Sequence, residues 1–147
     1  LNVDSKEKLL SEFERMMKIE GTNAVLMQPM LKGMELFAGM KREEKFGHMV
    51  LCGMGGIFIE ILKDVSTALC PLTHEEAFDM IDSLKSRAIM DGVRGQEGAD
   101  VDAFADILVR LSALAAAAPE IFEMDLNPLL GNNDHVVAVD ARINIAL

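Results

Sequence analysis

Two short segments near the end of the chain carry oxygen-bearing side chains whose spacing could serve a metal ion. In EMDLNPL (residues 123–129), Asp125 and Asn127 are two apart on an expected strand, so both point to one face. In VVAVDARI (136–143), the turn at 131–134 brings Asp140 back alongside. Hard oxygen ligands suit Mg²⁺, which combines one or two carboxylates with nucleotide phosphates. The spacing equally fits a polar turn in which Asn127 bonds the backbone and Asp140 pairs with Arg142, so both interpretations stay open.

Three other groups of residues could contact a ligand, and each also has an ordinary structural explanation. Glu35, at the head of an expected strand, could accept hydrogen bonds from sugar hydroxyls or could be a surface carboxylate. The run CGMGG (52–56) would allow close backbone approach to a ligand or simply form a tight turn. It matches neither a P-loop nor a dinucleotide fingerprint. Lys41, Arg42 and Arg94 could contact phosphate or could be surface charges.

Composition excludes several classes of function. The net charge of −10 argues against nucleic acid, which needs clustered Lys and Arg. No apolar run approaches the roughly 18 residues of a membrane helix, and no signal peptide opens the chain. Cys52 and Cys70 are expected to be buried, reduced thiols of a cytoplasmic protein. We expect no chemistry from the scattered histidines, which are His48, His74 and His135. The start at Leu1 suggests a piece of a longer chain or a processed one.

Hydrophobic periodicity predicts a helix followed by a set of strands in the first half of the chain. Asp4 is expected to cap the helix, with Glu7 at the capping-box position and an apolar face from Leu9 to Met17. Strands are expected over residues 24–30, 34–42, 48–52 and 57–64.

The second half is expected to contain two helices and then two strands. Thr73 and Glu76 form a capping box that opens a helix to about Lys85, and residues 90–98 read as a loop. A longer helix starts at Asp100 or Asp102 and ends at about residue 118. Strands follow at 121–127, where Pro128 favours a stop, and at 136–140. This order predicts a single α+β domain over residues 1–147, with a mostly antiparallel sheet packed by helices.

Taken in order, several segments resemble one family over nearly the whole chain: VLMQPMLKGMELFAGMKREEKFG, CGMGGIFIEILKDVS, CPLTHEEA, DGVRG, EMDLNPLL and VVAVDARI. They are similar to the C-terminal part, or second subdomain, of the ATP-grasp domain of ADP-forming acetyl-CoA synthetases. The same module occurs fused to some protein lysine acetyltransferases, and the succinyl-CoA synthetase β chain is a more distant relative. The resemblance implies an enzyme that interconverts acyl-CoA, ADP and phosphate with acid, CoA and ATP through a phosphohistidine.

The resemblance also implies roles for individual residues, with ATP or ADP and Mg²⁺ as cofactors. Gln28 to Met30 would border the adenine, and Glu35 would lie near the ribose. Asn127 and Asp140 match the magnesium ligands of the related β chain, and Asp125 matches the acidic partner beside them.

Departures from the family pattern limit what this chain can do by itself. Thr67 and Ala68 stand in the stretch where the family usually carries an Arg, and His48 stands where a Pro is common. The first ATP-grasp subdomain, with its phosphate-binding Lys and phosphorylatable His, and the CoA-binding and ligase domains lie outside this sequence. We therefore assign no catalytic residue here and expect the isolated chain to be inactive, with those domains as partners. The alternatives are a regulatory nucleotide-binding module of an acetyltransferase fusion and a plain interaction domain.

Overall fold

The computed structural model describes residues 3–56, 61, 63–93, 95 and 97–145. The chain divides into two compact units, Leu1–Leu31 and Lys32–Leu147. No helix in the described residues is long and apolar enough to cross a membrane. The expectation of a single domain stays a prediction.

The first unit is built around one amphipathic helix, α1 (Lys6–Met17). Ser5, and not Asp4 as the sequence predicted, caps it, because the Ser5 side chain accepts the N–H of Lys8 at 3.2 Å. Asp4 instead lies 3.6 Å from the Lys8 ammonium group, one turn along. No residue of α1 is buried, and Phe13 on its apolar face is 46% exposed.

The strand predicted over residues 24–30 does not form. Residues 22–32 carry neither helix nor strand, although the segment is rich in apolar side chains. A strand needs a neighbour for its backbone N–H and C=O groups, and none of the described strands pairs with this segment. The local composition favours a strand here, but the segment forms none because no described strand offers its backbone groups a partner.

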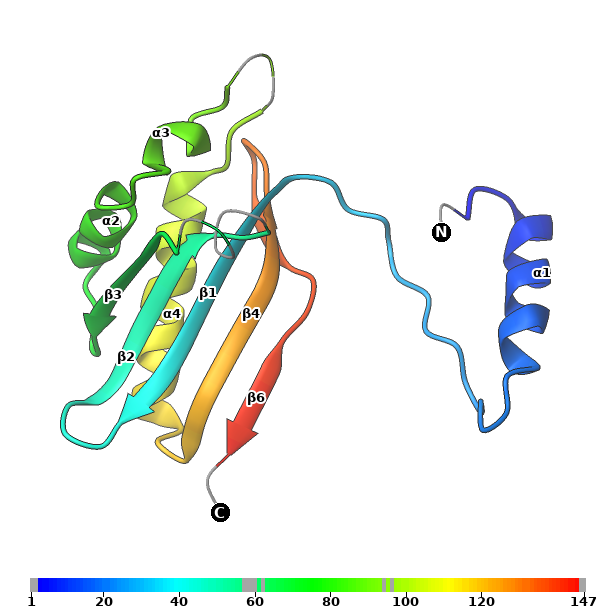
Figure 1. Ribbon diagram of the computed structural model, residues 1–147, viewed down its shortest axis with the longest axis horizontal. Coiled ribbons are helices and arrows are strands. Elements are labelled where there is room, and N and C mark those ends of the chain that lie inside the picture. Colours follow the sequence, from blue (N-terminus) through cyan, green and yellow to red (C-terminus); the bar gives the residue numbers. More distant parts are fainter. Residues whose placement is uncertain (1–2, 57–60, 62, 94, 96, 146–147) are drawn as a thin grey trace. The chain divides into compact units, whose positions relative to one another are not determined.

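The second unit combines a six-stranded sheet with three helices (Figure 1). Its elements are β1 (Met34–Glu43), β2 (Gly47–Met54), β3 (Val65–Leu69), α2 (His74–Asp82), α3 (Arg87–Met90), α4 (Val101–Ala117), β4 (Ile121–Gly131), β5 (Val136–Ala138) and β6 (Arg142–Ile145). The strand order is β3-β2-β1-β4-β5, and β6 also pairs with β4. Each described pairing is antiparallel, which confirms the predicted α+β class with a mostly antiparallel sheet.

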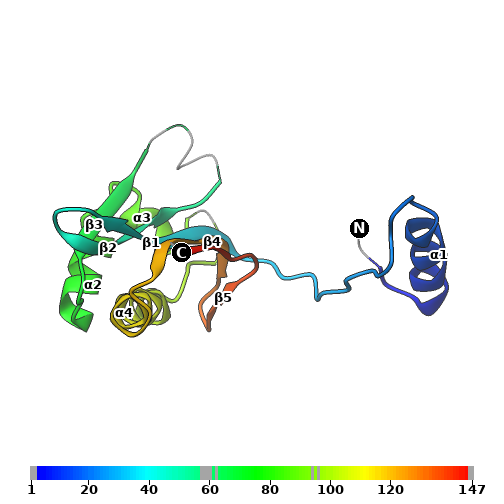
Figure 2. The ribbon, with the colours of Figure 1, turned by 90° about the horizontal axis from the view of Figure 1, so that it is seen from below.

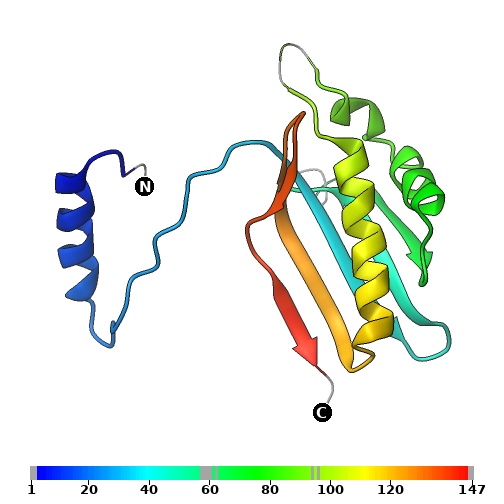
Figure 3. The same cartoon turned by 180° about the vertical axis from the view of Figure 1, so that it is seen from behind.

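Helices α2 and α4 cover one face of this sheet, as Figures 2 and 3 show. Alternate residues of β1, namely Leu36, Ala38 and Met40, belong to the same buried apolar cluster as Phe104 and Leu108 of α4. The residues between them point the other way, because successive side chains of a strand alternate between its two faces. We call the face opposite α2 and α4 the open face.

Local signals located the helices of this unit well. The capping box of Thr73 and Glu76 is present with both of its hydrogen bonds, and Asp100 caps α4 by accepting the N–H of Ala103 at 3.0 Å. Helix α2 ends at Asp82, three residues before the predicted Lys85. The short helix α3 was not predicted, and its last residue, Met90, is the first residue of the predicted loop.

Strand β4 runs four residues past its predicted end and passes through Pro128. The register shifts here, because Leu36 pairs with Leu129 but Ala38 pairs with Leu126. Two residues of β4, Asn127 and Pro128, therefore face one residue of β1. Such a bulge tolerates a proline, which cannot donate to the ladder, so the predicted stop at Asn127 was wrong.

The last part of the chain also differs from prediction. The strand predicted over 136–140 ends at Ala138, and a further strand, β6, follows at Arg142–Ile145. Both pair with β4. The strand predicted over 57–64 falls mostly on residues outside the described ones, while Lys63 and Asp64 belong to no strand.

Candidate functional site

The open face of the sheet collects the polar residues that the sequence singled out in the second unit. On β1 it carries Glu35, Phe37 and Gly39, which alternate with the core residues. On β4 it carries Asp125, because Asp125 pairs with Gly39 and lies between the core-facing Met124 and Leu126. Residues far apart in sequence thus share one surface.

Asp140 lies between β5 and β6, and the registers of both strands on β4 put its position across from Asn127. Leu129 pairs with Ala138 and Asp125 pairs with Arg142, so counting along both strands places Asp140 across from Asn127. The N–H of Val139 donates to the carbonyl of Pro128 at 3.1 Å, which holds this register where β5 ends. The Asn127 and Asp140 side chains are both exposed.

The charges around this pair are unbalanced toward the negative. Asp125 is half-buried, and burial together with the charges of Glu123 and Asp140 raises its pKa, while Arg142 opposes the shift. The Arg142 guanidinium lies 3.7 Å from an Asp140 oxygen, with side-chain exposures of 83% and 55%. An exposed pair of this kind contributes at most about 1 kcal/mol, so it leaves Asp140 accessible to a stronger cation. The ion pair that the sequence offered as the alternative is therefore present, but it is weak.

Glu35 is an exposed residue at the start of β1 on the same face. It pairs with Leu130 of β4, and Phe37, two residues along, faces the bulge that contains Asn127. The Glu35 carboxylate lies toward the end of β2, beside Gly56, whereas Asn127 lies on β4, on the other side of β1. This arrangement could accommodate a ligand with hydroxyl groups at one end and a metal-bound anion at the other.

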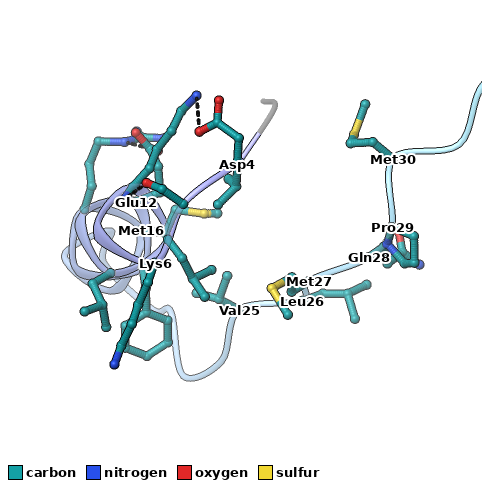
Figure 4. A pocket seen from close by; sticks show the side chains of 17 residues that line it. Asp4, Lys6, Glu12, Met16, Val25, Leu26, Met27, Gln28, Pro29 and Met30 are labelled. Carbon is teal, nitrogen blue, oxygen red and sulfur yellow. Dashed lines mark hydrogen bonds and ion pairs between the residues drawn. The ribbon is translucent and has the colours of Figure 1, made fainter.

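The first unit contains a separate hollow of about 1380 Å³ between α1 and residues 25–30 (Figure 4). Gln28 and Met30 line it, together with apolar side chains such as Leu9 and Val25. Met30 itself is 65% exposed. The two proposed adenine neighbours thus belong to the first unit, whereas Glu35, Asn127 and Asp140 belong to the second.

Comparison with known proteins identifies the family. The model of the ATP-grasp domain family matches residues 1–145. This chain belongs to the ATP-grasp family. It is 41% identical over 150 residues to an ADP-forming acetate–CoA ligase I of Archaeoglobus fulgidus, covering 97% of this chain and 22% of that protein. It is 46% identical over 111 residues to a β subunit of acetate–CoA ligase I of Pyrococcus furiosus, covering 76% of this chain and 48% of that subunit. The chain therefore spans less than half the length of either relative.

A solved structure supports the same assignment. The acetyl-coenzyme A synthetase 1 of Candidatus Korarchaeum cryptofilum, in complex with coenzyme A and Mg-AMPPCP, superposes with a TM-score of 0.88 at 33% identity. The match covers 99% of this chain and 66% of that one, and that structure has a phosphohistidine segment pointing towards its nucleotide-binding site. The fold predicted by resemblance, part of an ATP-grasp domain, is confirmed.

Other candidate residues of this ATP-grasp chain have mostly structural surroundings. Lys41 pairs with Glu43 at 3.3 Å, and Arg42 is exposed at the far end of β1. Arg94 lies outside the described residues. At the family departure, Thr67 is exposed, while Ala68 packs against the core.

The histidines and cysteines make local contacts. His48 Nε2 lies 2.7 Å from the carbonyl oxygen of Ile121, and His74 Nε2 lies 3.1 Å from an Asp106 oxygen. Cys52 is buried, and its burial, with the charge of Asp64 adding to it, raises the pKa of the thiol to about 12, so it stays a thiol at neutral pH. Cys70 is only half-buried, which corrects the prediction that both thiols are buried, and both are free of disulfides.

One charged residue of structural importance was missed by the sequence analysis. Asp64 is buried with 7% exposure, and its two oxygens accept the N–H groups of Lys85 and Ser86 at 3.0 and 2.7 Å. Burial by itself would raise the pKa of Asp64, but the hydrogen bonds from Ser86 and Lys85 outweigh it and hold the pKa below its ordinary value. The only sign of this role in the sequence is an acid placed close to apolar runs on both sides, and residue spacing does not predict that such an acid is buried.

Proposed function

We propose that this chain is the nucleotide-closing, C-terminal part of the ATP-grasp domain of an ADP-forming acyl-CoA synthetase. The complete protein would interconvert acetyl-CoA or a related acyl-CoA, ADP and phosphate with acid, CoA and ATP. The observation that carries the proposal is the register that puts the position of Asp140 across from Asn127, with the charge of Asp140 close enough to Asp125 to raise its pKa. The relatives named above are CoA ligases, which favours a ligase over an acetyltransferase fusion.

The donor chemistry at this position fits Mg²⁺. Asn127 offers a carbonyl oxygen and Asp140 a carboxylate oxygen, and both are hard ligands. The described residues contain no group of three or more His, Cys, Asp or Glu side chains that could hold a metal by themselves. Magnesium takes one or two protein ligands and completes its shell with phosphate and water. When bound, the ion would offset charge on the nucleotide phosphates.

The protein residues around the metal position would set where the phosphates lie. Asn127 and Asp140 would hold the metal-bound phosphates at one corner of the open face, and Asp125 would keep that corner negative. Glu35, at the start of β1, would accept hydrogen bonds from the ribose hydroxyls. Gln28 and Met30 would border the adenine once the complete domain is assembled. None of these residues moves a proton or forms a bond to the substrate.

The remaining chemistry would belong to other parts of the complete protein. Both named ATP-grasp relatives are longer than this chain, and we propose that it works with a first ATP-grasp subdomain and with the CoA-binding and ligase domains as partners. The histidine that carries the phosphoryl group would lie there, since the three histidines here make contacts within their own unit. We propose a cytoplasmic protein whose isolated C-terminal part is inactive, with no nucleic acid or membrane as partner.

Binding calorimetry on the complete protein tests the proposal. Asn127→Ala should weaken magnesium-dependent ADP binding by about tenfold or more, on the scale of losing one hard oxygen ligand. Asn133→Ala, at the exposed tip of the same hairpin, is the matched control and should bind normally. Equal affinity of the two variants would refute the metal assignment. A complete protein that forms no ATP from acyl-CoA, ADP and phosphate would refute the activity.

A further inference from the structure

The glycine-rich run at the end of β2 packs directly against Glu35. The N–H of Gly55 donates to the carbonyl oxygen of Glu35 at 2.7 Å. A Cβ built on Gly55 would lie 3.1 Å from the Cβ of Glu35, and a Cβ on Gly56 would lie 2.6 Å from its Oε2 atom. Real Cβ contacts are essentially never that short, so any side chain at position 56 would displace the carboxylate. The Glu35 side chain is therefore folded over this turn.

The first glycine of the run has the same relation to the next open-face residue of β1. A Cβ on Gly53 would lie 2.6 Å from the Cε1 atom of Phe37 and 2.5 Å from the carbonyl oxygen of Asp64. Phe37 is only 5% exposed although it lies outside the helix-covered core, so its ring is held against the backbone of β2. Three glycines thus accommodate two successive open-face side chains, Glu35 and Phe37.

Gly47 lacks this property. Gly47, in the turn between β1 and β2, has a φ of +78° and nothing within 4 Å of a built Cβ. Its lack of a side chain serves only the backbone conformation of the turn. Gly56 combines a positive φ of +59° with the contact to Glu35, so its conformation and its small size are both needed. Comparing the two glycines separates turn formation from side-chain placement.

We propose that Gly56 is a positioning residue that fixes the carboxylate of Glu35 and so sets the recognition of ribose hydroxyls. The proposal rests on the function proposed above, in which Glu35 is the ribose acceptor. An exposed glutamate free to sample its rotamers must be ordered when a ligand binds, and that ordering weakens affinity. The turn lowers this cost by leaving room for Oε2 beside Gly56, where a residue with a side chain would push the carboxylate to another position. The glycine thus acts through Glu35.

The ratio of dissociation constants for 2′-deoxy-ADP and ADP, measured by calorimetry on the complete protein, tests this. A carboxylate that recognises ribose hydroxyls discriminates against the deoxy nucleotide, and mere loss of stability does not change the ratio. Gly56→Ala should reduce the discrimination by about threefold to tenfold, on the scale of one hydrogen bond to a charged group. Gly47→Ala, the control for left-handed backbone strain, should lower the melting temperature and leave the ratio unchanged.

Variants of Glu35 test the positioning role of Gly56 separately from the ribose-binding role of Glu35. Glu35→Ala should reduce the ratio, and adding Gly56→Ala to it should reduce the ratio no further, because the glycine acts through the glutamate. If Glu35→Ala leaves the ratio unchanged, the ribose assignment is wrong. If Glu35→Ala reduces it but Gly56→Ala behaves like Gly47→Ala, only the positioning role is wrong.

A shorter side chain keeps the test decisive if Gly56→Ala fails to fold. Glu35→Asp retains the charge but draws the carboxylate away from Gly56. It should lose discrimination nearly as far as Glu35→Ala does. Full discrimination by Glu35→Asp would show that placement against Gly56 is unimportant and would overturn the proposal.

Discussion

The two faces of the sheet are made from the same strands and have opposite properties. On the face covered by α2 and α4, Leu36, Ala38 and Leu129 are fully buried among apolar neighbours. On the open face, the alternate residues of the same strands include the acids Glu35 and Asp125 together with Phe37 and Gly39. A change on the covered face should therefore cost stability, and a change on the open face should cost ligand binding or turnover.

Glycine also differs in role between the two kinds of position. Gly53 and Gly56 leave room for Phe37 and Glu35 on the open face, where ring and carboxylate lie against backbone. In the covered core, room is filled by large side chains such as Phe104 and Leu108. The open face is thus built to hold a few side chains in place, and the covered face to exclude water.

Of the changes that test the difference between the two faces, one on the covered face should have the largest effect. Phe104→Ala should lower the free energy of unfolding by about 3–5 kcal/mol, because Phe104 is fully buried and its removal leaves a cavity. Denaturant unfolding measures this. Phe46→Ala, at a 70% exposed position in the β1–β2 turn, should change stability by no more than about 0.5 kcal/mol. Similar losses for both variants would contradict the assignment of the core.

On the open face, Asp140→Asn should damage turnover and spare stability. Losing a metal-binding carboxylate should reduce kcat of the complete protein about 100-fold and raise its magnesium requirement, on the scale of losing an electrostatic stabiliser. The melting temperature should move little, since Asp140 is exposed. Steady-state kinetics across a magnesium series measures this, with Asp134→Asn in the same hairpin as control. Normal turnover of Asp140→Asn at limiting magnesium would remove Asp140 from the site.

Replacing Asp64 tests whether its buried negative charge stabilises the folded protein. Asp64→Asn should cost about 1–3 kcal/mol at neutral pH, because one of the N–H groups of Lys85 and Ser86 loses its acceptor. The pKa of Asp64 is lowered in the folded protein, so its ionised form contributes stability above the unfolded pKa of about 3.9.

That contribution should disappear as the pH falls through the lower, folded-state pKa of Asp64. Unfolding curves at pH 7 and near pH 3 for the wild type, Asp64→Asn and the exposed control Asp79→Asn measure it. A stability difference between wild type and Asp64→Asn that does not shrink in acid would show that the charge is irrelevant.

The smallest expected effect is at the ribose position. Glu35→Ala should raise the KM for the nucleotide by up to about tenfold and leave kcat nearly unchanged, since a carboxylate on ribose hydroxyls holds substrate and transition state equally. Glu44→Ala, an exposed acid in the turn after β1, is the control. A reduced kcat with an unchanged KM would place Glu35 in the chemistry and not in uniform binding.

Some elements could be predicted because their causes are local in the chain. The capping box of Thr73 and Glu76 depends on two residues that are three apart. The pairing of β1 with β2 depends on two consecutive strands and the short turn between them. The opposition of Asn127 and Asp140 was also accessible, because a hairpin brings residues on either side of its turn together. The family resemblance then supplied the magnesium-binding role that we propose for these two residues.

Other features could not be predicted, because they depend on partners distant in sequence. The strand expected at 24–30 lacks a neighbour among the described residues, and β4 continues past Pro128 because β1 meets it with a bulge. The burial of Asp64 depends on backbone N–H groups 21 and 22 residues away. The sequence by itself determined which side chains alternate and which residues begin the helices, since those patterns arise from backbone geometry over a few residues. Only the tertiary structure decided that Gly56 lies against Glu35 and that α2 and α4 cover the same face of the sheet, because both depend on which strands pair and where the helices pack.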